Sequence, residues 1–262
     1  MTPIRIASRK RGLPLYCCLG GGPVEGVPVC VTGLNPDGPE RFAAARQAEG
    51  HRAFKLKVGF GRDLDPRDLG ALRATLGPSA VLMVDANQAL TPASALDLSR
   101  AATPFDPLWL EEPLRVAAPE ADWRALAAAS PIRLAGGENL RGADLDEAVT
   151  ADMLHVVQPD ATKWGGVTGT IAVARAAAAR GESFCPHVFG GGVAPLASLH
   201  LLAAAGGDGL LEFDHHPNAG REPVVGSLLP VGREYVPVPQ GAGIGVVPDI
   251  GALDRYRSWP PR

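Results

Sequence analysis

From Val27 onward, the chain alternates between short apolar runs and longer amphipathic segments. The apolar runs have the length and composition of buried parallel strands, which are covered on both faces. The segments between them are rich in Ala and Leu, and several begin with Asp, Thr or Pro and end near Gly, as helices do. The predicted strands are VPVCVTG (27–33), AFKLKVG (53–59), AVLMVDA (80–86), PLWLEEP (107–113), IRLAGGE (132–138), LHVVQPD (154–160), SFCPHVF (183–189) and LLEFDHH (210–216).

The helical patterns include PERFAAARQAEG (39–50), DPRDLGALRATLG (65–77), TPASALDLSRAAT (91–103) and VTGTIAVARAAAARG (167–181). Eight strands that alternate with seven helices predict an α/β fold, a (β/α)7β TIM-like barrel with a closed parallel sheet. An open doubly wound sheet alternates in the same way and is the main alternative. It is less favoured because the first strand is not followed by a GxGxxG turn.

The two ends of the chain depart from this alternation. Residues 1–26 contain Gly and Pro and predict an irregular segment with one helical turn, a remnant of a linker to the barrel. Residues 217–262 are rich in Pro and Gly and predict a C-terminal tail that packs on the outside of the barrel. The barrel itself is predicted over residues 27–216.

Composition narrows the range of partners. The chain has 262 residues, 46% hydrophobic and 20% charged, with a formal net charge of -3. This balance is typical of a soluble globular domain, and it provides no general attraction for nucleic acid or an anionic membrane. No apolar run is long enough for a membrane span. The sequence leaves a homo-oligomer open.

The four cysteines, Cys17, Cys18, Cys30 and Cys185, have neither the CxxC spacing of a zinc site nor the density of a disulfide scaffold. We therefore expect free thiols and a cytoplasmic location. Cys185 is expected to be a small buried residue. The apolar stretch at residues 13–19 is too short for a secretory signal.

Polar and charged side chains stand where nearly every predicted strand ends. Buried strands do not end in such groups without cause, and in a barrel the carboxyl ends of all strands meet at one mouth. Singly, each acid is more plausibly a surface residue or a helix cap, but recurrence on consecutive strands favours a shared role. These residues are Lys55, Lys57, Asp85, Asn87, Glu111, Glu112, Glu138, Asp160, His187 and Glu212.

Two kinds of chemistry follow from this set. The carboxylates of the third, fourth and fifth strands would repel one another unless a cation lies between them, and an oxygen-only ligand set suits Mg²⁺. Lysines on the second strand, and Asp160 with His187 on the sixth and seventh, supply bases on either side, since an Asp can orient an imidazole and raise its basicity. Lys163, three residues after Asp160, could fold back as its ion-pair partner, and we expect it to have a structural role; Trp164 is expected to pack at the rim. Packed or surface positions are expected for His155, His200, His215 and His216.

At these residues the chain resembles the enolase superfamily and, within it, the mandelate racemase subgroup. The matching segments are FKLKVG, VDANQAL, WLEEPL, GGENL, QPDATKWGGVTG and CPHVFGGG. They occur in the family's order and span most of residues 27–216. The muconate-lactonizing type is similar elsewhere but has a lysine where Asp160 stands, so a lactonizing or dipeptide-epimerase activity is less favoured.

The resemblance implies a magnesium-dependent enzyme acting on a small carboxylic acid or sugar acid, with Mg²⁺ as cofactor. Removal of the proton α to the carboxylate would give an enediolate, which nearby cations stabilise. The favoured outcome is dehydration of a sugar acid (an aldonate or aldarate); the alternative is racemisation or epimerisation of a 2-hydroxy acid. The implied roles are Asp85, Glu111 and Glu138 as metal ligands, Lys57 and His187 as acid–bases, Asp160 orienting His187, Lys55 and Glu212 at the substrate carboxylate or enolate, and Asn87 as a substrate contact.

Members of this family normally carry an N-terminal α+β capping domain, and we expect it to be missing from this chain. A third alternative is therefore a truncated, non-catalytic barrel that binds metal. The geometric expectation is that the carboxyl groups of Asp85, Glu111 and Glu138 converge on one point. Lys57 and His187 should then stand on opposite sides of it, with an open mouth above.

Overall fold

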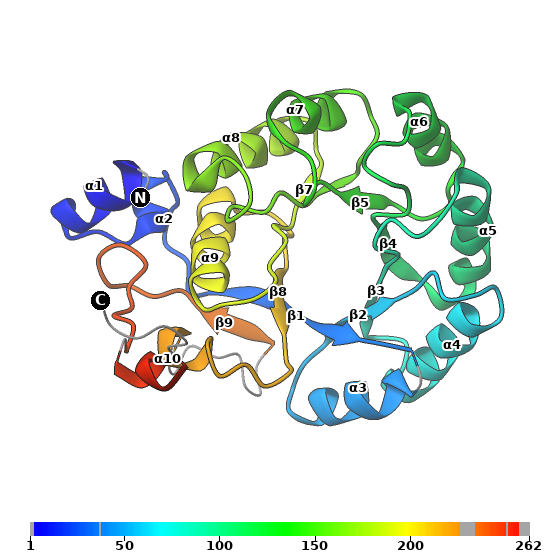
Figure 1. Ribbon diagram of the computed structural model, residues 1–262, viewed down its shortest axis with the longest axis horizontal. Helices are drawn as coiled ribbons and strands as arrows, with labels where there is room; N and C mark the ends of the chain where they lie inside the picture. Colours follow the sequence, from blue (N-terminus) through cyan, green and yellow to red (C-terminus); the bar gives the residue numbers. More distant parts are fainter. Residues whose placement is uncertain (1–2, 37, 226–233, 250, 257–262) are drawn as a thin grey trace.

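A computed structural model describes residues 3–36, 38–225, 234–249 and 251–256. Within these residues, eight parallel strands curl into a ring with helices around its outside (Figure 1). The hydrogen-bonded order is β7-β6-β5-β4-β3-β2-β1-β8, so the strands follow the sequence and β8 lies beside β1. Their bounds are β1 Gly26–Leu34, β2 Ala53–Lys57, β3 Val81–Asp85, β4 Pro107–Glu111, β5 Leu134–Gly136, β6 Val156–Val157, β7 Ser183–Phe184 and β8 Leu211–Asp214.

A helix follows each of the first seven strands, which confirms the predicted (β/α)7β alternation. Helix α5 shows how the sequence determines an element. The side chain of Thr91 accepts a hydrogen bond from Ser94 N, Pro92 occupies the first turn, and Ala95 and Leu98 are buried on one face. The seven helices are α3 Pro39–Ala48, α4 Leu64–Leu76, α5 Pro92–Ala102, α6 Glu120–Ala129, α7 Gly142–Thr150, α8 Gly166–Ala179 and α9 Val193–Ala205, with a short 3-10 turn η1, Thr103–Phe105, after α5.

The ring closes differently between β7 and β8, which are the two ends of the hydrogen-bonded order. Ser183 Oγ donates to Asp208 Oδ2 at 2.8 Å, and the backbone N–H at position 210 donates to Cys185 Sγ at 3.3 Å. Gly209 lies at this junction, where an added Cβ would stand 2.2 Å from the carbonyl oxygen of Phe184. Side chains and a close backbone approach therefore complete the wall.

Side chains of mixed size, from alanine to tryptophan, fill the interior of the ring below its mouth. Strands β1 to β6 each contribute one residue to this layer, and Cys185 follows β7. Burial raises the pKa of the Cys185 thiol to about 12, which agrees with its expected role as a small buried residue. The layer consists of Cys30, Ala53, Met83, Trp109, Ala135, Val156 and Cys185.

The first residues contain more helix than predicted, with α1 over Pro3–Arg11 and α2 over Leu15–Cys18. Basic residues in the last turn of α1 stabilise it by interacting with the negative end of the helix dipole. Gly12 ends the helix in a left-handed conformation, with a φ of 66°. The buried side chains of Leu15 and Tyr16 join the same core cluster as α9. The prediction of a single helical turn therefore underestimated the helical content of this segment.

The C-terminal tail lies against the barrel, with β9 (Tyr235–Pro237) pairing antiparallel to β1. Val236 and Val238 are buried in the core cluster beneath it. The tail also contains α10 (Glu222–Val225) and a 3-10 helix η3 (Gly251–Tyr256). Parts of the predicted end segments, namely residues 1–2, 226–233, 250 and 257–262, lie outside the described residues, and the domain boundaries stay predictions.

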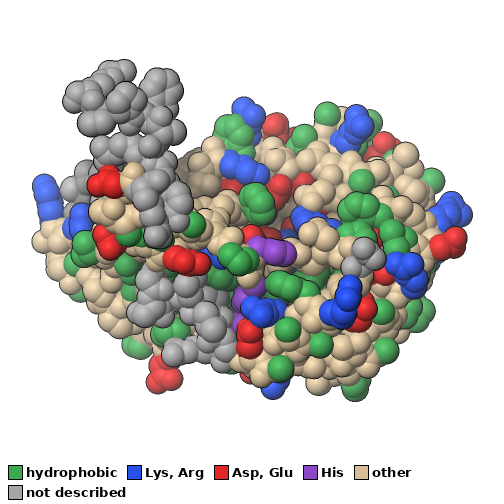
Figure 2. Space-filling model, turned by 60° about the horizontal axis from the view of Figure 1, so that its bottom comes forward, with side chains coloured by type: hydrophobic (Ala, Val, Ile, Leu, Met, Phe, Trp, Pro, Cys, Tyr) green, Lys and Arg blue, Asp and Glu red, His purple; other side chains and the backbone are tan. Residues whose placement is uncertain are grey.

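Two observations concern the surface. Within the described residues, none of the helices has both the length and the apolar character needed to cross a bilayer. On the face shown in Figure 2, acidic and basic side chains are interspersed, with histidines near its middle. This face presents no extended area of one charge.

Candidate active site

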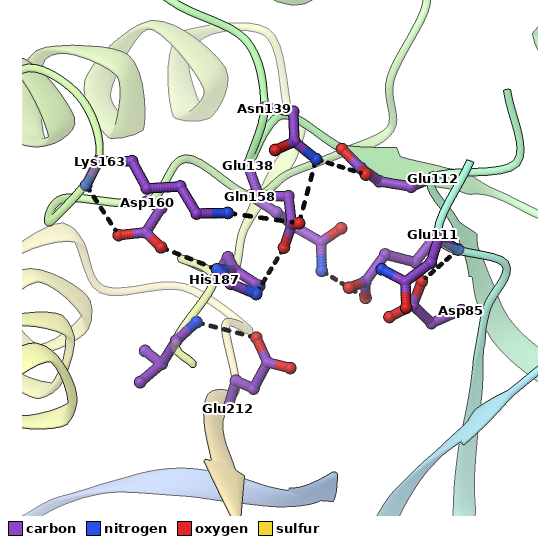
Figure 3. A network of polar contacts seen from close by, with 12 residues as sticks. Asp85, Glu111, Glu112, Glu138, Asn139, Gln158, Asp160, Lys163, His187 and Glu212 are labelled. Atoms are coloured by element: carbon purple, nitrogen blue, oxygen red, sulfur yellow. Dashed lines mark hydrogen bonds and ion pairs between the residues drawn. The ribbon is translucent and has the colours of Figure 1, made fainter. Parts of the chain in front are cut away.

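A cavity of about 620 Å³ opens at the carboxyl ends of the strands. Six of the residues predicted from strand ends line it: Lys57, Asn87, Glu138, Asp160, His187 and Glu212. Lys55, Asp85 and Glu111 are each 2% exposed and lie just behind this group: Asp85 contacts Lys57, Lys55 contacts Glu212, and Glu111 contacts Lys55. The structure thus brings residues from seven strand ends into one network, most of which is drawn in Figure 3.

Lys55 lies within a set of carboxylates on one flank of the network. Its Nζ is 2.6 Å from Glu111 Oε1, 2.7 Å from Glu212 Oε1 and 3.7 Å from Asp85 Oδ2. Burial acts to lower the pKa of Lys55, but these carboxylates outweigh it and raise the pKa well above its usual value. The residue is therefore a permanent buried cation beneath the cavity.

Lys57 is the accessible lysine of the same strand. Its Nζ lies 2.5 Å from both Asp85 Oδ2 and Asn87 Oδ1, and its side chain is 28% exposed. The ladder sets this arrangement, because Lys57 is the register partner of Asp85 and Asp85 that of Glu111. Asn87 adopts a left-handed φ of 42°, which Asn tolerates better than most residues and which turns it toward Lys57. Burial and the neighbouring Glu111 raise the pKa of Asp85.

His187 occupies the other flank between two carboxylates. Its Nδ1 is 2.9 Å from Asp160 Oδ2 and its Nε2 is 2.5 Å from Glu138 Oε2. Burial acts to lower the pKa of His187, but the two carboxylates raise it to about 10. The imidazole is thus held by both ring nitrogens and is protonated at neutral pH. In Figure 3, His187 and Asp160 lie on one side, and Asp85 and Glu111 on the other.

Asp160 is fixed by its own loop. Its Oδ1 accepts hydrogen bonds from Thr162 Oγ1 at 2.6 Å and from Thr162 N at 2.7 Å. Although burial raises its pKa, His187 and Thr162 bring it down to about 2. Lys163 pairs through Nζ with Glu138 at 3.5 Å, so its ion-pair partner is Glu138 and not the nearer Asp160 that the sequence offered. Burial acts to raise the pKa of Glu138, but the hydrogen bond from His187 and its charge bring that pKa down to about 2.

Two residues that the sequence reasoning missed hold Glu111 in place. Gln158 Nε2 donates to Glu111 Oε2 at 2.8 Å, and Trp109 Nε1 donates to the same oxygen at 3.2 Å. Glu111 Oε1 is left for Lys55. A signal was present, because Trp109 stands two residues before Glu111 on the same strand face and Gln158 lies within the QPD segment.

The neighbouring Glu112 belongs to a different set. Asn139 Nδ2 donates to both Glu112 Oε2 at 2.8 Å and Glu138 Oε1 at 3.1 Å. Burial, followed by the charge of Glu138, raises the pKa of Glu112 to about 7. Of the two adjacent glutamates, only Glu111 contacts Lys55 directly.

The donor chemistry of Asp85, Glu111 and Glu138 fits Mg²⁺, since the set is made of buried carboxylate oxygens without softer ligands. In this structure each of the three pairs with a protein cation instead: Asp85 with Lys57, Glu111 with Lys55, and Glu138 with His187. Among the described residues, no three His, Cys, Asp or Glu side chains are arranged to hold a metal ion. The predicted convergence of the three carboxyl groups therefore stays a prediction.

The tryptophan and histidines predicted as packed or surface residues lie partly in packed positions and partly in the cavity wall. Trp164 contacts Arg141, whose guanidinium carbon stands 3.5 Å from the ring centroid. His155 and His200 pack against neighbouring backbone and ring groups. His216 lines the cavity together with Asp214, so its assignment as an ordinary surface histidine was incomplete.

Comparison with known proteins places this architecture. Residues 39–252 match the family described as enolase C-terminal domain-like. The chain belongs to that family. Members with solved structures include the mandelate racemase/muconate lactonizing enzyme from Bordetella bronchiseptica RB50, 41% identical with a TM-score of 0.90, over 97% of this chain and 71% of that one. The expected resemblance to the mandelate racemase type of the enolase superfamily is thereby confirmed.

Relatives of this enolase C-terminal domain-like chain have names from sugar-acid metabolism. D-galactarolactone cycloisomerase of Agrobacterium fabrum (strain C58) is 32% identical over 98% of this chain and 72% of its own length. D-gluconate dehydratase of Thermoproteus tenax is 28% identical over 97% of this chain and 54% of its own length. The chain thus spans about half to three quarters of these relatives.

Proposed function

We propose that this chain is the barrel of a Mg²⁺-dependent enzyme that removes the proton α to the carboxylate of a sugar acid and then expels a β-hydroxyl group. The observation that carries the proposal is the placement of Lys57 and of the His187–Asp160 pair on different flanks of one cavity. The names of the relatives, which act on gluconate and on a galactarolactone, support a sugar acid as substrate.

The residues of the chain divide the proton transfers. Lys57, once its ammonium proton has passed to water, takes the proton from C2 through Nζ. The resulting enediolate is dianionic, so Lys55, a buried cation beneath the cavity, offsets part of its charge. His187, protonated and held by Asp160, donates its Nε2 proton to the leaving β-hydroxyl once Glu138 no longer takes it.

Asp85, Glu111 and Glu138 would hold Mg²⁺, which when bound supplies positive charge at the substrate carboxylate. This requires the cations that now pair with them to release at least one oxygen each. Glu111 has only Oε1 to offer, because Trp109 and Gln158 occupy Oε2. Glu212 accepts from Val188 N at 2.9 Å through Oε2 and has Oε1 beside Lys55; a proton on Oε1 would let it donate to the substrate carboxylate or enolate.

Two alternatives remain. Racemisation or epimerisation would use the same residues, with His187 returning a proton to C2 instead of releasing water. A barrel that binds metal without turnover is the second. The four thiols, all free in the structure, favour a reducing compartment, and we keep the cytoplasm as the proposed location.

The test is a screen of aldonic and aldaric acids with Mg²⁺ in D2O, read by NMR. A 2-keto-3-deoxy product is expected from at least one acid, and Lys57→Met should abolish it. Deuterium at C2 without loss of water would establish the racemase or epimerase instead. Mg²⁺ binding by calorimetry with no exchange on any acid would leave only the non-catalytic barrel.

A further inference from the structure

A second Asp–His pair lies in the same cavity, formed by residues at the end of β8. His216 Nδ1 is 2.8 Å from Asp214 Oδ1, and the His216 backbone N–H donates to the same oxygen at 3.0 Å. Both side chains line the cavity with Thr32 and Asn35 of the β1 end. Thr32 is the register partner of Asp214, so this group forms one wall where β1 and β8 meet.

The imidazole of His216 is held on several sides although it is 48% exposed. It stacks on Phe42, with ring centroids 5.0 Å apart and an interplanar angle of 9°. Gly33, with a φ of 83°, leaves the space beneath it open, since a Cβ there would lie 2.7 Å from His216 Nδ1. The buried Arg221 donates through Nη2 to the carbonyl of His216 at 2.7 Å. Phe42 and Asp214 thus orient the imidazole, and Arg221 fixes the backbone that carries it.

This orientation directs two atoms to a ligand. His216 Nδ1 faces Asp214 Oδ1, so Nε2 is the ring nitrogen left to accept from or donate to a ligand hydroxyl group. Within the described residues, the hydrogen bonds of this pair use Nδ1 and Oδ1, which leaves Nε2 and Asp214 Oδ2 for a ligand. The side chains of Thr32 and Asn35 add hydroxyl and amide groups nearby. Acceptors interleaved with neutral donors are what the hydroxyl groups of a polyol require.

Charge separates this wall from the rest of the cavity. Of the lysines and arginines among the described lining residues, Lys57 lies beside Asp85 and Lys163 beside Glu138. The charged lining group of the β1–β8 wall is the Asp214 carboxylate, which pairs with His216, while the buried Arg221 also interacts with its charge from behind the lining. A second carboxylate of the substrate would meet a like charge there, whereas a hydroxyl group would not.

We infer that the Asp214–His216 pair is a binding subsite for the hydroxyl groups at the far end of a polyhydroxy monocarboxylic acid, and that it selects such acids over dicarboxylic ones. The inference rests on the proposed function for the position of the substrate carboxylate. It specifies the substrate class and adds no step to the reaction.

Binding and exchange are measured separately to test it. Calorimetry with Mg²⁺ present compares a six-carbon aldonate, the aldarate of the same configuration and the three-carbon acid glycerate, and NMR in D2O follows deuterium at C2 of each. The wild-type chain should bind the aldonate at least about 10-fold more tightly than the aldarate, because like charges brought together cost affinity.

Variants of His216 test the wall directly. His216→Phe keeps the stacking on Phe42 but removes both ring nitrogens. It should weaken aldonate binding about 3- to 10-fold, the value of one hydrogen bond, and leave glycerate binding within about 2-fold. His215→Gln is the matched control, because His215 is adjacent in sequence and does not line the cavity. It should leave all three affinities unchanged.

The outcomes separate the two proposals. Equal or tighter binding of the aldarate, or equal losses for glycerate and aldonate in His216→Phe, would overturn the subsite, while a 2-keto-3-deoxy product seen by the same NMR would still uphold the proposed function. Selective aldonate binding without exchange on any acid would overturn the function and support the subsite. Neither binding nor exchange would reject both.

Discussion

The two halves of the barrel hold their site residues in different ways. Strands β1 to β4 have nine, five, five and five residues, whereas β5, β6 and β7 have three, two and two. Lys55, Lys57 and Asp85 lie within strands, where the register fixes their neighbours. Glu138, Asp160 and His187 lie beyond the ends of theirs and are positioned by contacts among their side chains. One flank is thus fixed by backbone pairing and the other by a polar network.

The largest expected effect comes from removing one acid–base group on each flank. Lys57→Met should slow removal of the C2 proton and His187→Asn should slow loss of the β-hydroxyl, each lowering the rate of dehydration by about 10²- to 10⁴-fold, the usual contribution of a positioned acid or base. In the racemase alternative, with the two groups on opposite faces, each variant loses exchange on one C2 epimer and keeps it on the other. NMR in D2O with both epimers measures this. If one variant lost exchange on both epimers and the other lost exchange on neither, a single flank would carry the acid–base chemistry of both faces.

The next prediction compares a lysine from each half. Lys55→Met should lower the free energy of unfolding by about 3–5 kcal/mol, because it leaves buried carboxylates without their cation. Lys163→Met is the matched variant, and it should cost less than about 1 kcal/mol, because the Lys163 side chain is 37% exposed. Urea unfolding followed by circular dichroism gives both values. Equal decreases in the free energy of unfolding would show that burial of the Lys55 charge adds nothing to stability.

Site residues that lie within strands could be predicted from the sequence. Lys55, Lys57 and Asp85 were accessible, because alternation along a strand places their side chains on one face and parallel pairing brings β2 beside β3. The alternation of apolar runs and helices likewise predicted the barrel. His187 and Asp160 were identified through position and family resemblance, since no periodicity describes loop residues.

The rest could not be predicted because it depends on long-range contacts. The pairing of Lys163 with Glu138 requires two loops to meet, and the sequence offered the nearer Asp160 as partner. The role of His216 depends on Phe42 and Gly33, which lie far from it in the chain. The nine-residue α1 exceeded the single turn expected from a segment rich in Gly and Pro.

A smaller effect tests whether side chains alone hold the second flank. Thr162→Val removes the hydroxyl that donates to Asp160 Oδ1, which should cost about 0.5–1.5 kcal/mol of stability and lower kcat more than KM. Thr162→Ser should restore both, because it keeps the hydroxyl. Thermal unfolding and steady-state rates give the comparison. An inactive Thr162→Ser would assign the effect to the lost methyl group.

The smallest effect is one of pH and should be common to both halves. Burial lowers the pKa of His51, which precedes β2, and of His155, which precedes β6, below their usual value. The unfolded chain therefore binds more protons below pH of about 6.5, and stability falls as the pH drops from there, by at most about 1.4 kcal/mol per pH unit for each histidine. His51→Gln and His155→Gln should each flatten the dependence measured by urea unfolding. A slope unchanged in both would exclude these two groups as its source.

The junction between β7 and β8 has a mechanical consequence. Elsewhere the wall is bound by ladders of backbone hydrogen bonds, but here it depends on a serine, a thiol and the absence of a methyl group at Gly209. This junction is therefore the part of the described barrel wall with the fewest backbone hydrogen bonds, and a force that expands the barrel would separate β7 from β8 first. Because the His187 and Glu212 ends border this join from either side, a slight widening there would alter the distance between them while the lysine flank stayed in place.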